Sequence, residues 1–296
     1  MRVGFVGLGR MGTPMARRLA ANRFPLTVFD ARPETAARLG AGVSVATSLA
    51  ALAEWSDVVV TMLPDGGAVR DVVLGKTDAA DRLLGAMPAG SVLVDMGSSS
   101  PTGTREIGRI LAQRGVAMLD APVSGGVARA ENGTLAIMVG GERALIDHCR
   151  PLFTAIGREI FETGPLGSGH ALKALNNLVS AAGLLAAAEA LVVGRRFGLD
   201  ANVMIDVFNA SSGRNNSTEN KFKQFVLSGT FASGFSLDLM VKDLATAVEL
   251  ARATDTPAAL GSVCRDLWAA AQADLDPGAD HTAIVRWLEG LAKTRL

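Results

Sequence analysis

The clearest indication of the fold is near the start of the chain, in Arg2-Val3-Gly4-Phe5-Val6-Gly7-Leu8-Gly9-Arg10-Met11-Gly12. It begins as a short apolar segment typical of a buried strand. It ends in a GxGxxG motif that leads directly into a helical segment near Pro14. In this context Gly7 allows a tight turn, Gly9 lets the backbone approach a pyrophosphate, and Gly12 lets the helix pack closely on the strand. Because the first N–H groups of such a helix bind phosphate, the stretch predicts a dinucleotide site.

The second apolar segment, Leu26–Asp30, supplies an acidic residue at the expected place. Asp30 follows Gly12 by 18 residues, close to the spacing of about 20 at which a carboxylate binds the ribose 2′-hydroxyl. A carboxylate there repels a 2′-phosphate, so the sequence favours NAD. Arg32 could instead accept that phosphate, which leaves NADP as the less favoured alternative. The predicted NAD-binding residues are Gly7, Leu8, Gly9, Arg10, Met11, Gly12 and Asp30.

Short apolar segments alternate with helical ones through the first half of the chain, which is typical of βαβ units and a mainly parallel sheet. After about residue 165 the strand pattern stops. We therefore predict an α/β Rossmann-type domain at residues 1–164 and an all-α domain at residues 165–296. The predicted strands are Arg2–Val6, Leu26–Asp30, Asp57–Met62, Ser91–Asp95, Val116–Asp120, Leu135–Val139 and Glu159–Thr163. The predicted helices include Pro14–Ala21, Pro33–Leu39, Pro101–Arg114, Ala171–Phe197, Ala201–Ala210, Asn220–Leu227, Leu237–Ala253, Pro257–Ala273 and Thr282–Leu291.

The composition excludes several classes of protein. Apolar residues make up 49% of the chain and charged residues 20%, so a disordered chain is excluded. Since 29 basic and 29 acidic residues balance, we expect no nucleic-acid partner. The two cysteines and three histidines are scattered, so we predict no metal site. The most apolar segment, Leu178–Gly194, contains Glu189, and we expect a buried helix in a cytoplasmic protein, with no membrane partner.

Three further blocks of sequence stand out. The first is Asp120–Gly126, followed by Asn132–Leu135 and Gly140-Gly141; the second is Gly167–Asn177; and the third is Leu239–Asp243. Together with the GxGxxG motif, these blocks resemble the β-hydroxyacid dehydrogenase family, which includes 3-hydroxyisobutyrate dehydrogenase and tartronate semialdehyde reductase and is related to 6-phosphogluconate dehydrogenase. The resemblance implies a Rossmann-type domain, a long connecting helix, and a helical domain that also forms a dimer interface.

The second block carries the expected chemistry. Lys173, Asn176 and Asn177 lie at positions i, i+3 and i+4 of a predicted helix, so their side chains share one face. The resemblance implies that Lys173 is the catalytic acid/base and that Asn177 orients the substrate or the lysine. Oxidation of an alcohol needs a base for the hydroxyl proton while hydride leaves the carbon. A lysine whose pKa is lowered by desolvation can take that proton.

Other predicted contacts also come from the family pattern. Ser124, Gly125 and Gly126 form a turn of small residues whose N–H groups can bind an anion, and the resemblance implies that this turn binds the substrate carboxylate. Ser98 matches a family threonine that lies against the nicotinamide, although the preceding Gly97 departs from the usual serine. The remaining implied cofactor contacts are Leu63, Pro64 and Lys242.

The polar segment Ser211–Ser217 takes the place of the family's substrate-facing loop. We predict that Arg214 and Asn215 bind the substrate. Many relatives carry an aromatic residue shortly after this arginine, whereas this chain has Asn215 and Asn216. Amides favour a substrate with extra hydroxyl groups, such as glycerate, serine or threonate, over 3-hydroxyisobutyrate with its methyl group.

We therefore expect an NAD-dependent oxidoreductase that interconverts a small 3-hydroxy carboxylic acid and its semialdehyde by hydride transfer. The alternatives are an imine reductase on the same scaffold and a non-catalytic NAD-binding module. Relatives of both kinds generally lack the lysine, so Lys173 argues against them. A helix that is apolar nearly all round, Leu178–Gly194, favours a homodimer or homotetramer.

Overall fold

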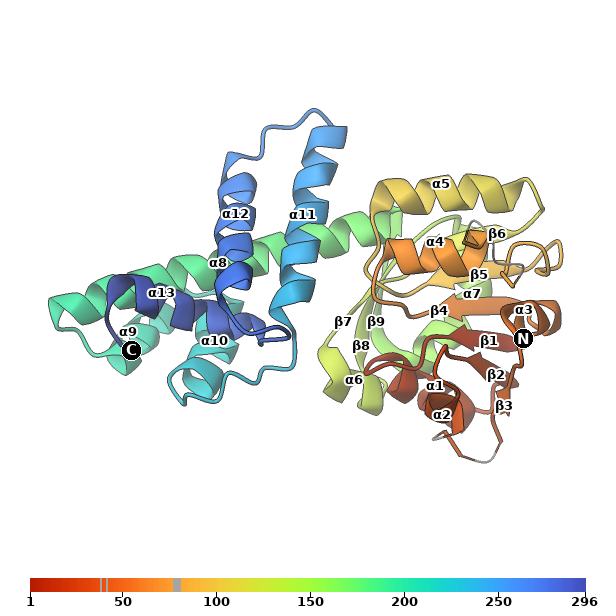
Figure 1. The fold of residues 1–296 in the computed structure, drawn as a ribbon, viewed down its shortest axis with the longest axis horizontal. Coiled ribbons are helices and arrows are strands. Elements are labelled where there is room, and N and C mark those ends of the chain that lie inside the picture. Colours follow the sequence, from red (N-terminus) through yellow and green to blue (C-terminus); the bar gives the residue numbers. More distant parts are fainter. Residues whose placement is uncertain (38, 41, 77–80) are drawn as a thin grey trace. The chain divides into compact units, whose positions relative to one another are not determined.

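The computed structural model describes every residue except 38, 41 and 77–80, and the described chain forms two compact units. The first unit is Met1–Lys173 and the second is Ala174–Leu296. The long helix α8 (Ser168–Phe197) begins in the first unit and continues through the second (Figure 1). The sequence-based boundary between residues 164 and 165 lies in the turn before this helix.

The first unit is built on one sheet, which has nine strands in the part of the chain that is described. The strand order is β3-β2-β1-β4-β5-β6-β8-β7, with β9 paired to β8. The first six strands of that order are parallel and reproduce the doubly wound arrangement that binds dinucleotides. The strands are β1 (Val3–Val6), β2 (Leu26–Phe29), β3 (Ser44–Val45), β4 (Val58–Thr61), β5 (Val92–Asp95), β6 (Ala117–Asp120), β7 (Val123–Ser124), β8 (Leu135–Gly140) and β9 (Gly157–Gly164).

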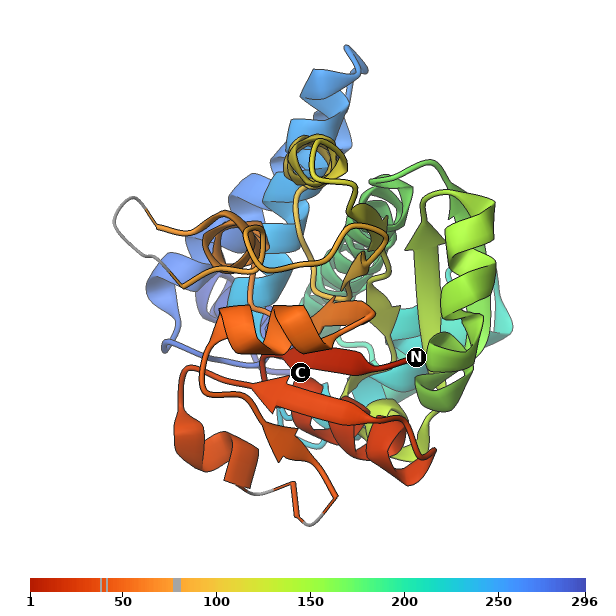
Figure 2. The same cartoon turned by 90° about the vertical axis from the view of Figure 1, so that its right-hand side faces the viewer.

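Helices cover both faces of this sheet (Figure 2). Successive side chains of its central strands therefore belong in turn to two buried clusters, one on each face. On β4, for example, Val58 and Val60 pack with α1 and α7, whereas Val59 packs with α3, α4 and α5. Side chains of successive strand residues point to opposite faces, so a strand covered on both sides needs apolar residues throughout. The helices are α1 (Gly12–Ala21), α2 (Pro33–Ala37), α3 (Leu49–Trp55), α4 (Gly66–Leu74), α5 (Pro101–Ala112), α6 (Gly126–Asn132) and α7 (Arg143–Ile156).

The second unit is helical and packs around the middle of α8. Leu184, Ala188 and Leu191 of α8 are fully buried in a cluster with Phe222 and Trp268. Helices α11 (Leu237–Ala253) and α12 (Ala259–Asp274) run side by side in this unit (Figure 1). The remaining helices are α9 (Ala201–Ala210), α10 (Asn216–Asn220), the π-helix η1 (Phe222–Val226), the 3₁₀-helix η2 (His281–Ala283) and α13 (Ile284–Ala292).

The predicted fold class is confirmed: a mainly parallel α/β domain is followed by an all-α domain. Each of the seven predicted strands is present within one or two residues of its expected bounds, whereas the two-residue strands β3 and β7 were not predicted. The predicted helix Asn220–Leu227 is a π-helix, Phe222–Val226, that follows α10. The predicted helix Pro33–Leu39 is observed as Pro33–Ala37, and its residue 38 lies outside the described residues.

Helix α8 is long and apolar enough to cross a bilayer by composition alone. Half of that apolar window is buried inside the structure, as in the core helix of a globular domain. Its first turns also carry the polar residues Lys173, Asn176 and Asn177. These features agree with a buried helix in a soluble protein.

Candidate cofactor and substrate sites

The glycine motif forms a tight turn between β1 and α1. Gly7 has a positive φ of 98°, and a Cβ atom there would overlap the carbonyl oxygen of Met62. A Cβ atom on Gly12 would overlap the carbonyl oxygen of Gly7. A Cβ atom on Gly9, by contrast, would meet nothing within 4 Å. Gly7 and Gly12 are therefore required by the fold, whereas Gly9 borders open space that a bound pyrophosphate can occupy.

Asp30 connects the end of β2 to this turn. Its carboxylate accepts hydrogen bonds from the backbone N–H groups of Leu8, at 2.6 Å, and Arg32, at 2.9 Å. The Arg32 guanidinium lies 3.7 Å from the same carboxylate and is largely exposed. An acid held beside the glycine turn suits a ribose with a free 2′-hydroxyl, so the residues present fit NAD.

The other predicted cofactor contacts of the first unit follow strands at the same edge of the sheet. Leu63 and Pro64 follow β4, and Ser98 follows β5, so both segments lie at the carboxyl ends of parallel strands. A Cβ atom on Gly97 would lie 2.9 Å from the Leu63 carbonyl oxygen, which brings these two loops into contact. Dinucleotides bind outside the carboxyl ends of such strands, where the strand order reverses. Here that reversal falls between β1 and β4.

The predicted carboxylate-binding turn joins β7 to α6. Gly125 and Gly126 both have positive φ angles, 131° and 67°, and both are exposed. Ser124, the last residue of β7, is half-buried. A turn of consecutive small residues with positive φ angles can offer its N–H groups to an anion, so the geometry is compatible with the predicted role.

A buried polar network in the first unit was not predicted. The Asp120 carboxylate accepts hydrogen bonds of 2.7 Å from the backbone N–H groups of Gly167 and His170, at the start of α8. The His170 ring is buried, with Nδ1 2.8 Å from Thr104 Oγ1 and Nε2 3.7 Å from the Asp95 carboxylate. The network therefore holds the first turn of α8 against the end of β6, and its residue His170 precedes Lys173 by three positions. Asp120 and Gly167 belong to two of the sequence blocks described above, but neither block indicates that the two residues are hydrogen-bonded to each other.

Lys173 and Asn177 lie on one face of α8, and both are buried, with 9% and 6% of their surface exposed. The Asn177 amide donates a 2.5 Å hydrogen bond to Asp243 on α11. Lys242 Nζ lies 3.3 Å from the other Asp243 oxygen. Asn176 is exposed, and its side-chain amide donates to Oδ1 of Asn177 at 3.2 Å.

The predicted substrate residues of the loop have partners of their own. Asn215 is the N-cap of α10: its side-chain oxygen accepts from the N–H groups of Ser217 and Thr218, at 2.8 and 3.3 Å. Asparagine is preferred at this position because its oxygen satisfies N–H groups that lack a helical partner. Arg214 is exposed and lies 3.6 Å from Glu219.

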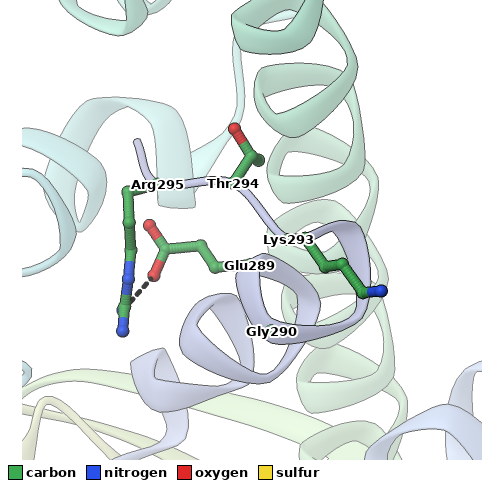
Figure 3. A pocket seen from close by; sticks show the side chains of 5 residues that line it. All are labelled: Glu289, Gly290, Lys293, Thr294 and Arg295. Atoms are coloured by element: carbon green, nitrogen blue, oxygen red, sulfur yellow. Dashed lines mark hydrogen bonds and ion pairs between the residues drawn. The ribbon is translucent and has the colours of Figure 1, made fainter.

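A hollow of about 390 Å³ lies at the end of α13. It is lined by Glu289, Gly290, Lys293, Thr294 and Arg295 (Figure 3). Arg295 reaches back to the Glu289 carboxylate at 3.0 Å, so the two charges neutralise each other. None of these five residues belongs to the predicted site.

A doubly wound sheet with this glycine turn is typical of dinucleotide-binding domains, and here it is followed by a helical domain. Residues 2–164 match the NAD-binding domain of 6-phosphogluconate dehydrogenase. Residues 167–288 match the NAD-binding domain of NADP-dependent 3-hydroxyisobutyrate dehydrogenase. The chain therefore belongs to the β-hydroxyacid dehydrogenase family, which confirms the resemblance found in the sequence.

Relatives and solved structures agree over nearly the whole chain. The chain is 36% identical to 2-(hydroxymethyl)glutarate dehydrogenase of Eubacterium barkeri, covering 97% of this chain and 94% of that one. It is 37% identical to NAD-dependent L-serine dehydrogenase of Pseudomonas aeruginosa, covering 90% and 91%. The structure of Mycobacterium tuberculosis 3-hydroxyisobutyrate dehydrogenase with L-serine is 35% identical, covers 97% and 99%, and gives a TM-score of 0.88. The chain is thus an NAD-dependent hydroxyacid dehydrogenase, with NADP as a possible cofactor.

Proposed function

We propose that Lys173 is the general acid/base of this dehydrogenase. The observation that carries the proposal is its position: it is buried on the face of α8 that also bears Asn177. In the direction of oxidation, uncharged Nζ of Lys173 takes the hydroxyl proton as the carbinol C–H bond breaks. In the direction of reduction, the ammonium returns that proton to the carbonyl oxygen. Asn177, braced by Asp243, orients the reacting oxygen or the lysine.

The glycine turn and Asp30 bind the cofactor, whose nicotinamide, when bound, exchanges hydride with the substrate carbon. Leu8, Arg10 and Met11 contribute backbone of that turn. The further cofactor contacts that we propose are Leu63, Pro64, Ser98 and Lys242. The turn Ser124–Gly126 binds the substrate carboxylate through its N–H groups and the serine hydroxyl. The Rossmann-type domain, residues 1–164, then serves the cofactor, and residues 165–296 serve the substrate and subunit association.

The substrate that we propose is a small 3-hydroxy acid with a further polar group. Arg214, Asn215 and Asn216 lie in the loop that corresponds to the family's substrate-facing loop. Many relatives carry an aromatic residue there, which suits a methyl group, whereas these polar side chains suit a polar substituent. Asn215 also caps α10. Where the β-carbon of such a substrate is a terminal CH2OH group, as in glycerate or serine, loss of hydride from that carbon and of the hydroxyl proton gives a semialdehyde.

The test is a substrate panel. Formation of NADH from NAD, and of NADPH from NADP, would be measured in parallel with 3-hydroxyisobutyrate, glycerate, L-serine, threonate and 2-(hydroxymethyl)glutarate. We expect NAD to be preferred, and a polar acid to give a higher kcat/KM than 3-hydroxyisobutyrate. Efficient turnover of 3-hydroxyisobutyrate alone would contradict the polar substrate, and no turnover of any 3-hydroxy acid would contradict the function.

We also propose that the protein is a cytosolic homodimer or homotetramer. Helices α8 and α9 carry exposed apolar side chains at helical spacing, and Phe197 is 85% exposed. Such surfaces are rare on monomers unless they bind a partner. The residues are Val193, Phe197, Val203 and Val207. Sedimentation of the protein and of Phe197→Glu tests this: the variant should dissociate, and a monomeric parent would contradict it.

A further inference from the structure

A second lysine lies close to the polar face of α8. Ser180 follows Lys173 by seven residues, so the two side chains leave the helix within about 20° of each other. The ammonium of Lys221, which follows α10, lies 3.2 Å from the Ser180 hydroxyl. The Lys221 side chain is thereby brought from another part of the helical unit to the face that bears Asn177.

Lys221 is half-buried, and among the described residues its ammonium forms no ion pair with a carboxylate and hydrogen-bonds to the Ser180 hydroxyl. The acidic group that attracts the Lys221 ammonium electrostatically is Asp280, which has other hydrogen-bond partners. The Asp280 carboxylate already accepts hydrogen bonds from Ser233, Gly234 and Thr282, at 2.6 to 3.0 Å. A positive charge that is partly removed from water and lacks an adjacent counter-charge is costly, unless a ligand supplies one.

The acid–base properties of Lys221 agree with this geometry. Burial lowers the pKa of Lys221 to about 8, and the electrostatic attraction of Asp280 offsets this only in part. The group therefore remains mostly charged at neutral pH, but it is poorly compensated. An anion bound beside it would restore the missing interaction.

We propose that Lys221 and Ser180 bind a second carboxylate on the substrate, so that the enzyme prefers 3-hydroxy acids that are dicarboxylic. This rests on the proposed function, in which Lys173 marks the reacting carbon. Ser180 lies about 10 Å further along α8, so the second carboxylate must be separated from the reacting carbon by several bonds. One ammonium and one hydroxyl match the single charge of a carboxylate better than the double charge of a phosphonate.

Lys223, two residues along the chain, provides a matched control. It is exposed, and its ammonium is paired with Asp206. A substitution there removes one positive charge from the same segment without touching α8. Lys221→Met removes the charge and keeps the length of the side chain, and Lys221→Arg keeps the charge.

The kinetic experiment compares 2-(hydroxymethyl)glutarate with L-serine. In Lys221→Met we expect KM for the dicarboxylic substrate to rise by about ten- to a hundred-fold, the range for a lost hydrogen bond to a charged group. The kcat for the dicarboxylic substrate should stay within about twofold of the parent value, and so should kcat and KM for L-serine. A twofold change is about the error of such comparisons. Lys221→Arg should recover most of the loss, and Lys223→Met should behave as the parent. Equal losses for both substrates would show a structural role and overturn the proposal.

A binding experiment separates this proposal from the reaction itself. Glutarate and 3-phosphonopropionate would be titrated calorimetrically into the parent and Lys221→Met in the presence of NADH. Glutarate should bind the parent and bind the variant at least about tenfold more weakly, a difference of 1.4 kcal/mol. Unchanged glutarate binding, or tighter binding of the phosphonate, would overturn the carboxylate assignment. The binding experiment tests the carboxylate site even if no hydroxy acid is turned over. A lack of turnover would count only against the dehydrogenase function.

Discussion

Asn177 and Asp243 form a buried hydrogen bond of 2.5 Å that links α8 to α11 within the helical unit. Asp243 is 2% exposed, and its second oxygen lies 3.3 Å from Lys242. The bond therefore connects the face of α8 that carries the proposed base with the Lys-Asp pair of the third sequence block. It also gives Asn177 a structural task in addition to its proposed role toward substrate.

Replacing Asn177 by leucine should destabilise the protein. The change removes a donor from a buried carboxylate, and we expect a loss of about 1–3 kcal/mol in the free energy of unfolding. Urea unfolding followed by circular dichroism measures it. Asn202→Leu, at an exposed position of α9, is the control and should change stability by less than about 0.5 kcal/mol. Equal stability of Asn177→Leu and the parent would contradict the role assigned to this bond.

Replacing Lys173 by methionine should remove the proposed acid/base while filling the same space. We expect kcat to fall by about 10²- to 10⁴-fold, the usual contribution of a positioned proton donor or acceptor. NADH affinity, measured by fluorescence, should stay near that of the parent, since the change leaves the glycine turn intact. A variant that retains more than about a tenth of the parent kcat would place the proton transfer elsewhere, because that loss is well below this range.

Alanine at Gly9 and at Gly12 should have opposite effects. The Cβ of Gly9→Ala would meet nothing in the protein, so the fold should persist while the Kd for NADH rises by about tenfold, or 1.4 kcal/mol. The Cβ of Gly12→Ala would overlap the Gly7 carbonyl oxygen, so stability should fall by about 1–3 kcal/mol. Thermal unfolding and NADH titration of both variants distinguish these outcomes. Normal NADH binding by Gly9→Ala would argue against a pyrophosphate at this turn.

Asp30 should control the choice between NAD and NADP. In Asp30→Ser the repulsion of a 2′-phosphate is lost and Arg32 becomes available to bind it. We expect kcat/KM for NADP relative to NAD to rise by about tenfold or more, equivalent to 1.4 kcal/mol or above. In the double variant with Arg32→Ala the gain should disappear. An unchanged cofactor ratio in Asp30→Ser would mean that another residue makes this distinction.

Asp280 should make the helical unit sensitive to acid. Burial raises the pKa of its carboxyl, but hydrogen bonds from His281, Thr282 and Ser233 outweigh that effect and hold the pKa well below its usual value. A depressed pKa stabilises the fold above the unfolded value of about 3.9, and the contribution is lost as the pH falls through the lower folded value.

The corresponding variant is Asp280→Asn. Relative to the parent, it should lose about 1–3 kcal/mol at neutral pH, and the difference should shrink as the pH falls below about 4. Asp276→Asn, at an exposed position, should follow the parent at every pH. Unfolding curves measured across this range would contradict the assignment if the difference did not depend on pH.

Much of the fold could be predicted because its signals are local. Runs such as Val58–Thr61 are buried on both faces of a parallel sheet, so they read as continuous apolar strands. The glycine turn and Asp30 were predictable because their spacing along the chain is set by one βαβ unit. The strands β3 and β7 were missed because two residues carry no periodicity.

Four features follow from the amino-acid sequence alone: the βαβ pattern, the glycine turn, the acid at Asp30, and the helix face shared by Lys173 and Asn177. Each depends on residues close together in the chain, where strand and helix periodicity fix which side chains share a face. The partners of the polar side chains depend on the packing of the folded chain: Asp120 with the start of α8, Asn177 with Asp243, and Lys221 with Ser180. The residues of these pairs are 41 to 66 positions apart, and a polar side chain that leaves water takes whichever partner the packing of distant elements brings to it.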